Sequence, residues 1–368
     1  MKILHTHPIG ILCLYLAISG CSDNSPLSKV PEYPAEDDSI SSSSSLDEES
    51  SDSFEKISSN YSSSNASSSS LVTDTTVSEI WNGKASTPKT EYRNGDYYMA
   101  ISTAEELAYF ANQVTNLGNT SLNAYLTKNI RLNPDSIVDK NGNLLMEASE
   151  LREWTPIGSN ELNHQYAGVF DGNGHTISGV YVNNPSADRA GFFGTANNAT
   201  IKNLGIVNSH ILGKNYVGGI AGRANEGFID QVFNEAFVSG NYAGGIVGYM
   251  SKDSLTNAYN KGKIYSTQYA AGIAGYKSSG TINATYNIGS IRGSGTLCGI
   301  SCYGNSDNSY YISDSFVELI AKNATEKSGY TMQFSSFAAT LNSAAGDSYW
   351  HYNSSINNGY PIFPWEEK

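Results

Sequence analysis

The sequence predicts an all-β protein folded as a parallel β-helix, in which the chain winds into coils that stack on one another. A glycine-rich phrase recurs at intervals of 26 to 28 residues, and self-similarity at such a period is typical of a solenoid. The glycines and β-branched residues within each unit exclude helical hairpin repeats. The copies are Gly191–Gly194, Gly218–Gly222, Gly244–Gly248, Ala271–Gly275 and a degenerate Cys298–Cys302.

Each coil contains two further segments after the glycine phrase. A short segment that ends in asparagine comes first, and a third short segment follows, as at Lys263–Tyr265 and Ser290–Arg292. We therefore expect three short strands per coil, parallel to their copies above and below. The segments that end in asparagine are Ile229–Asn234, Leu255–Asn260 and Ile282–Asn287.

The repeat also predicts which side chains lie inside the coils. The isoleucines of the glycine phrases should stack as an internal ladder, and the asparagines fall at turn positions, where their side chains bond their own backbone and tolerate a left-handed conformation. The glycines require either a positive φ or a close approach between coils. The ladder residues are Ile220, Ile246, Ile273 and Ile300, and the asparagines are Asn234, Asn260 and Asn287.

The composition divides the chain into five parts. Residues 1–20 are predicted to be a lipoprotein signal peptide, and residues 21–78 a disordered linker rich in serine and acidic residues. Residues 79–189 should form an N-terminal cap and the first coils, residues 190–303 the repeat coils, and residues 304–368 a C-terminal capping region.

The first residues are typical of a targeting segment. The apolar run Ile9–Ile18 is too short to span a membrane as a permanent helix. The sequence Leu16–Cys21 resembles a bacterial lipobox, in which cleavage before the cysteine is coupled to its acylation; the alternative is an ordinary secretory signal with a stray cysteine. A lipidated Cys21 would hold the protein at a membrane. By resemblance to lipoprotein sorting rules, Ser22 rather than Asp at the next position favours the outer membrane.

The negative charge is concentrated in the linker. The chain carries a net charge of −13, and residues 22–80 contain twelve acidic residues against two lysines. This serine-rich segment cannot bury enough apolar surface to offset its ordering entropy, so we expect an extended tether. The remainder is nearly neutral, and no basic patch argues for a nucleic-acid partner.

Helices are expected on both sides of the repeats. A strand at Tyr97–Ile101 follows an Asn-Gly turn, and Ser102–Glu105 has the composition of a capping box. Apolar residues then recur at helical spacing at Leu107, Phe110, Ala111 and Val114 over about 13 residues, and this helix should cover the open end of the stack. Further short strands are expected around 124–132, 154–157 and 175–182. A second helix is predicted near 332–341, and an aromatic cluster between Trp350 and Trp365 should seal the final coil.

The recurring Gly-Gly-Ile-Val-Gly phrase resembles the GLUG motif of bacterial surface proteins. The segments Ile101–Leu107, Trp154–Gly158, Phe170–Gly179 and the ending Asn357–Ile362 fit the same setting, and the resemblance covers roughly residues 97–365. It implies a right-handed parallel β-helix displayed at the cell surface. The motif also occurs beside IgA-cleaving metallopeptidases, whose catalysis sits in a separate domain. This chain has no His-Glu-x-x-His, so that activity does not carry over.

The acidic residues do not predict a catalytic site. Polysaccharide lyases and hydrolases need carboxylate clusters with Ca²⁺ or a closely spaced pair of acids. Between residues 190 and 303 the acids are Glu226, Asp230, Glu235 and Asp253, and no two share a repeat position. Asp171 and His175 are the best isolated candidates, but Asp171–Gly174 has turn composition. We therefore predict no catalytic residues, metal or cofactor.

Cys298 and Cys302 are the cysteines of the repeat region. Four residues of extended strand span roughly 13 Å, well beyond disulfide reach, so the two could pair only across a sharp bend. A metal site at these two cysteines is not expected, because no histidine or further cysteine accompanies them as a ligand. The favoured interpretation is that two small residues replace glycines in the last coil.

The best binding candidates are tyrosines that recur with the coil. Tyr249, Tyr276 and Tyr303 lie an odd number of positions from the buried isoleucines, so strand alternation predicts that they point outward, where they could stack on sugar rings or a partner surface. The even offset of a second column predicts inward side chains, and Arg223 and Arg292 are expected to be solvated. The second column is Tyr216, Tyr242 and Tyr269.

The sequence thus favours a non-catalytic, lipid-anchored surface protein used in adhesion or in binding a polysaccharide or surface protein. A polysaccharide-active enzyme and a purely structural surface component are the alternatives. A carboxylate cluster would indicate the enzyme, and an exposed aromatic surface would indicate the binder.

Overall fold

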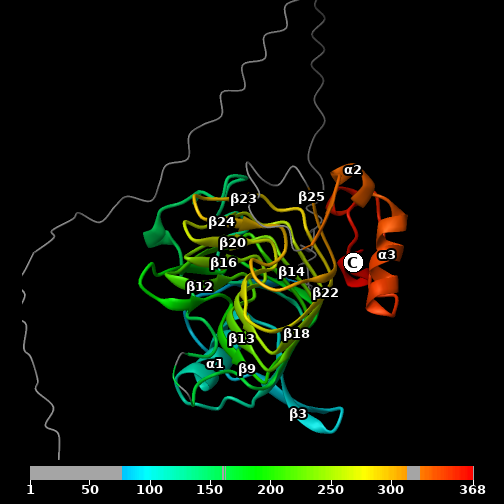
Figure 1. Cartoon of the computed structure of the whole chain (residues 1–368). Coiled ribbons are helices and arrows are strands. Elements are labelled where there is room, and N and C mark those ends of the chain that lie inside the picture. The colour runs from blue at the N-terminus through cyan, green and yellow to red at the C-terminus, as the bar shows by residue number, and fades with distance from the viewer. Residues whose placement is uncertain (1–76, 160, 162, 313–323, 368) are drawn as a thin grey trace, which may run out of the picture. The chain divides into compact units, whose positions relative to one another are not determined.

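The computed structural model describes residues 77–159, 161, 163–312 and 324–367. Within these residues the chain forms a parallel β-solenoid (Figure 1), as the period of the glycine phrase predicts. The signal peptide, Cys21 and nearly all of the linker lie outside the described residues, so the lipid anchor and the tether stay predictions.

The largest sheet has 12 strands and runs along one side of the solenoid. Its pairings are parallel, except for the antiparallel hairpin of β2 and β3. Its strands are β1 (Val77–Ile80), β2 (Lys89–Arg93), β3 (Asp96–Ile101), β4 (Asn123–Leu126), β5 (Asn129–Arg131), β6 (Val169–Ser178), β10 (Thr200–Val207), β14 (Phe228–Asn234), β18 (Asp253–Asn260), β22 (Gly280–Asn287), β25 (Asp307–Ile312) and β26 (Thr325–Lys327).

Three smaller parallel sheets complete the wall of the coils. The second sheet contains β7 (Tyr181–Asn183), β11 (His210–Leu212), β15 (Phe237–Ser239), β19 (Ile264–Tyr265) and β23 (Ile291–Arg292). The third contains β8 (Asp188–Ala190), β12 (Asn215–Gly218), β16 (Tyr242–Gly244), β20 (Tyr269–Ala271) and β24 (Thr296–Cys298). The fourth contains β9 (Phe193–Asn197), β13 (Ala221–Asn225), β17 (Val247–Ser251) and β21 (Ala274–Lys277).

The coils that begin with β6, β10, β14 and β18 have four strands each, so the expected number of three was wrong for them. Strand β12 ends at Gly218, the chain bends at Gly219 and Ile220, and β13 begins at Ala221. The glycine phrase is therefore a corner between two sheets. Close approach is its physical reason, because a Cβ on Gly219 would lie 2.1 Å from the Oδ1 atom of Asn234, and Gly219 does not have a positive φ.

The isoleucine ladder is confirmed. Its four members are fully buried, and the amide of Ile220 donates to the carbonyl of Ile246, 3.0 Å away, with the same bond repeated one coil further on. The asparagines form a second buried ladder, in which Asn234 Nδ2 donates to Asn260 Oδ1 and Asn260 Nδ2 donates to Asn287 Oδ1, both at 2.8 Å. Each also bonds its own backbone two residues on, as predicted, but none has the left-handed backbone.

Helix α1 (Ala104–Thr115) begins one residue later than the predicted capping box implies. Thr103 is the N-cap, and Glu106 rather than Glu105 completes the capping box. The four predicted apolar residues are buried, and Phe110 packs against Tyr166 and Phe170 of the first coils. The helix thus joins the main core, and its role as a cap stays a prediction.

The other predicted strands are partly confirmed. Residues near 124–132 form β4 and β5, and those near 175–182 belong to β6 and β7. Residues 154–157 form no strand, although Ile157 makes an isolated bridge to Phe193.

The C-terminal residues pack on the side of the solenoid. Helices α2 (Gly329–Met332) and α3 (Ser335–Ala345) replace the single predicted helix, and Figure 1 shows them beside β22 and β25. Trp350 and Phe363, expected to seal the final coil, instead lie against Tyr259 of β18. They cover the outer face of the largest sheet because that face carries aromatic side chains on successive coils.

Candidate binding surface

The column of Tyr249, Tyr276 and Tyr303 points outward, as predicted. Tyr249 and Tyr276 are register partners in β17 and β21, and their rings are nearly parallel, with centroids 5.6 Å apart. The ring centroid of Tyr303 lies 4.4 Å from that of Tyr276. The first two side chains are half-buried, and Tyr303 is 39% exposed.

The second column, predicted to point inward, also faces the surface. Tyr216, Tyr242 and Tyr269 are half-buried rather than part of the core. The prediction was wrong because the chain turns a corner at the glycine phrase, between this column and the isoleucines. Strand alternation holds within one strand, and it does not carry across a bend.

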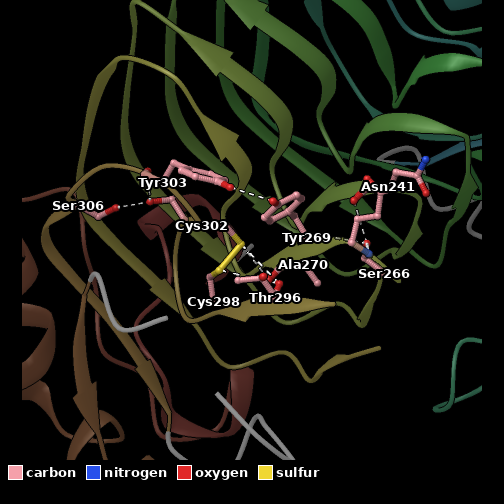
Figure 2. Close-up of a disulfide and its surroundings, with 11 residues drawn as sticks. Asn241, Ser266, Tyr269, Ala270, Thr296, Cys298, Cys302, Tyr303 and Ser306 are labelled. Carbon is pink, nitrogen blue, oxygen red and sulfur yellow. Dashed lines mark hydrogen bonds between the residues drawn. A yellow bond between two sulfur atoms is a disulfide. The ribbon is translucent and has the colours of Figure 1, made fainter. Parts of the chain in front are cut away.

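The two columns mesh into one surface, which we call the tyrosine ladder: Tyr216, Tyr242, Tyr249, Tyr269, Tyr276 and Tyr303. Its three rungs join residues 33 or 34 positions apart, with ring centroids separated by 5.0, 5.9 and 5.4 Å. Figure 2 shows the last rung, where the hydroxyl of Tyr303 donates a 2.9 Å hydrogen bond to the hydroxyl of Tyr269. That bond raises the pKa of Tyr303 to about 12, so its phenol is neutral at physiological pH.

Stacking within the columns decides what the ladder presents to a ligand. The rings of Tyr242 and Tyr269 are 11° from parallel, and those of Tyr249 and Tyr276 are 4° from parallel. In these two pairs the ring faces cover one another, which leaves edges and hydroxyls for a ligand, whereas Tyr216–Tyr242 and Tyr276–Tyr303 are tilted by 35° and 43°. Aromatic edges carry partial positive charge, and a phenol both donates and accepts hydrogen bonds. The ladder thus suits an oxygen-rich ligand.

Arg223 is part of this surface rather than a solvated side chain. It is half-buried, it is the register partner of Tyr249, and its guanidinium carbon lies 5.3 Å from the centroid of the Tyr249 ring. A cation over an aromatic ring is attracted by the ring quadrupole. The charge of Arg223 alone predicted a solvated side chain, whereas its contact with Tyr249 arises from the register between neighbouring coils.

Cys298 and Cys302 form a disulfide, contrary to the favoured interpretation from the sequence. The last glycine-like phrase bends as its copies do, which brings the two Cα atoms to 5.1 Å instead of the distance along a straight strand. Figure 2 shows the bridge beside the last rung of the ladder. The disulfide therefore fixes the turn that leads directly into Tyr303.

Two other aromatic columns on the outside of the coils are covered by the chain itself. The rings of Phe233, Tyr259 and Tyr286 stack at 5.0 and 4.9 Å, and the C-terminal residues pack over them. The hydroxyl of Tyr259 donates to the carboxylate of Glu366 at 2.5 Å, and burial raises the pKa of that carboxylate to about 7.

The second covered column lies on the sheet of β7, β11 and β15. The ring of His210 lies 6.0 Å from that of Tyr181 and 5.1 Å from that of Phe237. Ile137 and Leu151, from the long connection before β6, pack on Tyr181. Burial lowers the pKa of His210 to about 4, so this histidine is neutral and structural.

The acidic residues serve local structure. Asp171 accepts hydrogen bonds from the amide of Asn173 and from the Asn203 side chain. Asp171–Gly174 lie within strand β6, where its register with β10 shifts, so the predicted turn was wrong. Asp253 is buried, with Oδ1 accepting from the Gly227 amide at 2.7 Å, and burial raises its pKa to about 7. A buried acid of this kind is out of reach of a polysaccharide.

No group of three or more His, Cys, Asp and Glu among the described residues could hold a metal ion. Within the same part of the chain, no helix is long and apolar enough to cross a membrane.

Comparison with known proteins assigns no family. No known family matches the chain. Halomucin of Haloquadratum walsbyi is 41% identical over 83 residues, which is 22% of this chain and 1% of halomucin; the chain thus spans about one hundredth of that relative. A solved structure described as "a putative immunoglobulin A1 protease from Bacteroides ovatus" is 18% identical and covers 73% of this chain and 92% of its own, with a TM-score of 0.47. The molecule is a parallel β-solenoid similar in part to these two proteins.

Proposed function

We propose that this protein is a non-catalytic, lipid-anchored cell-surface protein that binds an oligosaccharide through the tyrosine ladder. In this proposal, Cys21 carries the lipid at the outer membrane and the linker holds the solenoid away from it. The resemblance to GLUG-motif surface proteins supports the location, and so does the lipobox-like sequence before Cys21.

The disulfide also supports a location outside the cytosol. Disulfides persist in oxidising compartments and are rare in cytosolic proteins, where thiols are kept reduced. The Cys298–Cys302 bridge is therefore consistent with a secreted or surface-displayed chain.

The observation that carries the binding proposal is the contrast between the aromatic columns. The column of Phe233, Tyr259 and Tyr286 lies under the C-terminal residues, and that of Tyr181, His210 and Phe237 contacts the connection before β6. Among the described residues, no such segment packs on the tyrosine ladder. Contiguous aromatic surface left open to solvent is typical of a recognition site.

The spacing of the ladder favours an oligosaccharide over an extended peptide. Successive tyrosines in a column are 5.2–5.6 Å apart where the rings stack, which is close to the length of one pyranose unit in a glycan chain. Side chains on one face of an extended peptide recur only every ~6.8 Å. A glycan along the solenoid axis could therefore meet an equivalent pair of phenols at each sugar.

Binding of the full-length protein to a glycan array tests this proposal. Tyr276→Ala removes the central ring, which contacts Tyr242, Tyr249 and Tyr303, and should weaken glycan binding at least about tenfold. Tyr276→Phe keeps the ring and loses the hydroxyl, so it should weaken binding less than Tyr276→Ala. Tyr265→Ala, on a different sheet, is the control for loss of a partly buried tyrosine.

Thermal unfolding of each variant separates folding defects from binding defects. Equal glycan binding by wild type and a folded Tyr276→Ala variant would contradict the proposal. Release of shortened oligosaccharides during the incubation would instead favour the enzyme alternative, and it would point to residues outside the ladder.

A further inference from the structure

The tyrosine ladder continues into two arginines at its N-terminal end. Arg223 is the register partner of Tyr249 in the neighbouring coil. Arg189 occupies the same place before Tyr216, since its flanking residues Asp188 and Ala190 pair with Asn215 and Val217. The two arginines are 34 positions apart, as are the residues of two tyrosine rungs. They therefore form a fourth rung, made of guanidinium groups.

The backbone holds this rung in a defined geometry. Arg189 and Tyr216 both have positive φ values, of 65° and 53°, so the unusual conformation repeats from one coil to the next. Gly222, just before Arg223, packs on the backbone of Arg189, and a Cβ there would lie 2.4 Å from the Arg189 carbonyl carbon. The absence of a side chain at Gly222 thus lets the two arginine-bearing strands approach.

Among the described residues, neither guanidinium group forms an ion pair with a carboxylate. Arg189 Nε and Nη1 and Arg223 Nε are enclosed but have no hydrogen-bond partner among the described residues. Asp188 is the nearest acidic neighbour of Arg189 in sequence, and its carboxylate accepts a 2.7 Å hydrogen bond from Asn215.

Two like charges held together without an ion-pair partner are unfavourable in the free protein, and the nearby charge of Asp188 only partly offsets this cost. Burial lowers the pKa of Arg189, and the charge of Arg223 lowers it further. A carboxylate or sulfate between them would relieve this repulsion and would satisfy the unpaired N–H groups. Arginine is well suited to this role because its planar fork matches the two oxygens of a carboxylate.

Space for a ligand continues beyond this rung. A cavity of about 430 Å³ is lined by Arg189 together with Thr155, Ser159 and Asn184, a volume within the range of small-molecule sites. Glu153 and Asp188 also line it, so it suits a neutral sugar rather than the charged one. Its lining contains hydroxyl and amide groups that can hydrogen-bond a sugar. Arg189 belongs both to the rung and to the lining of the cavity, so the cavity adjoins this end of the ladder.

We propose that Arg189 and Arg223 form an anion subsite, and that the ligand of the ladder is an acidic oligosaccharide whose carboxylate or sulfate binds between them. This inference rests on the proposed function and adds the chemical class of the ligand. The phenol edges of the ladder contact the neutral part of the glycan, and the arginine pair selects the charged sugar.

Binding of the full-length protein to four probes tests the subsite: oligogalacturonate, the same oligosaccharide after carboxyl reduction, a heparin-derived oligosaccharide and poly-glutamate. Oligogalacturonate should bind at least about tenfold more tightly than its reduced form, since charge-assisted hydrogen bonds are lost on reduction. A preference for the heparin fragment over oligogalacturonate would identify sulfate as the favoured anion and would equally support the subsite.

Arg189→Gln and Arg223→Gln should each abolish most of the preference for the charged probe, because binding of the charged probe falls much more than binding of the reduced probe. Arg292→Gln is the matched control, because Arg292 is also half-buried with an unpaired Nη1 but lies on another sheet. Melting temperatures of all three verify folding.

The outcomes separate this inference from the proposed function. If Tyr276→Ala loses binding of both oligogalacturonate forms and the arginine variants behave as wild type, the ladder binds glycans but the subsite is refuted. If poly-glutamate binds more tightly than every glycan, the acidic oligosaccharide is refuted as the ligand. If no probe binds, both proposals fail.

Discussion

The hydroxyl of Tyr303 donates a 2.9 Å hydrogen bond to the hydroxyl of Tyr269, which lies across a corner of the coil and 34 positions earlier in the chain. The two rings also contact each other, with centroids 5.4 Å apart. This bond ties the exposed end of one tyrosine column to the other column. It joins strand β20 to the bend that follows the isolated bridge of Ser301.

Removing this hydrogen bond should loosen the end of the ladder without unfolding the solenoid. Tyr303→Phe keeps the ring and loses the donor, so the free energy of unfolding should fall by less than about 1 kcal/mol, as for a solvent-accessible hydrogen bond. Urea denaturation measures the change. If this hydrogen bond is the main interaction between the two hydroxyls, the double variant Tyr303→Phe/Tyr269→Phe should be little less stable than Tyr303→Phe alone. Losses of unfolding free energy that add up strictly would contradict this.

Reduction of the disulfide should destabilise the last coil by about 2 kcal/mol, the chain-entropy value for a loop this short. Reduction should lower stability because the Cys298–Cys302 bridge restricts the unfolded chain at the turn before Tyr303. Melting temperatures with and without reductant report the change. The double variant Cys298→Ala/Cys302→Ala is the control, and any response of that variant to reductant would show that the effect does not come from this bridge.

Asn260→Ala should be strongly destabilising, by about 2–4 kcal/mol, because several buried polar groups lose partners at once. The Asn260 side chain bonds Asn234 and Asn287 on the neighbouring coils and both backbone groups of Gly262. Asn225→Ala provides a matched comparison.

Asn225 also bonds an asparagine one coil away, Asn197, but at a half-buried site. Its loss should therefore cost less than about 1 kcal/mol. Chemical denaturation measures the free energy of unfolding of both variants. Similar losses of stability would show that burial of the asparagine ladder does not determine its contribution.

The stability of the protein should fall as pH rises through about 7, because the folded-state pKa of Asp253 is raised from 3.8 to about 7 by burial. Between these values the folded protein binds a proton that the unfolded chain has released. The stabilisation is therefore full below the unfolded pKa and is lost as pH rises through the folded pKa.

Asp253→Asn removes this cost, since an amide oxygen can still accept from Gly227 and no charge forms. At pH 8 the variant should be more stable than wild type by about 1–3 kcal/mol, with a smaller difference near pH 4. Glu366, whose pKa burial also raises to about 7, contributes a slope of the same sign. The double variant with Glu366→Gln should thus show the flattest pH profile in thermal unfolding, and an unchanged profile would refute the assignment.

The sequence by itself determined the repeating architecture. The 26–28 residue period gives the coil, and the isoleucines of the glycine phrase form the internal ladder as expected. The outward direction of Tyr249 also follows from the sequence, because this residue lies on the strand that starts immediately after Ile246. These properties depend on local alternation and on repetition, which a single sequence records directly.

The tertiary structure alone decided how distant parts of the coil meet. The bend at the glycine phrase adds a fourth strand, turns Tyr216 outward and brings Cys298 to Cys302. Phe363 covers Tyr259 because the C-terminal residues pack back against the outer face of the largest sheet. The pairing of Arg189 with Arg223 likewise depends on the angle between two sheets. Side-chain alternation along a strand does not predict the angle between two sheets. The binding surface could therefore be identified only from the folded coils.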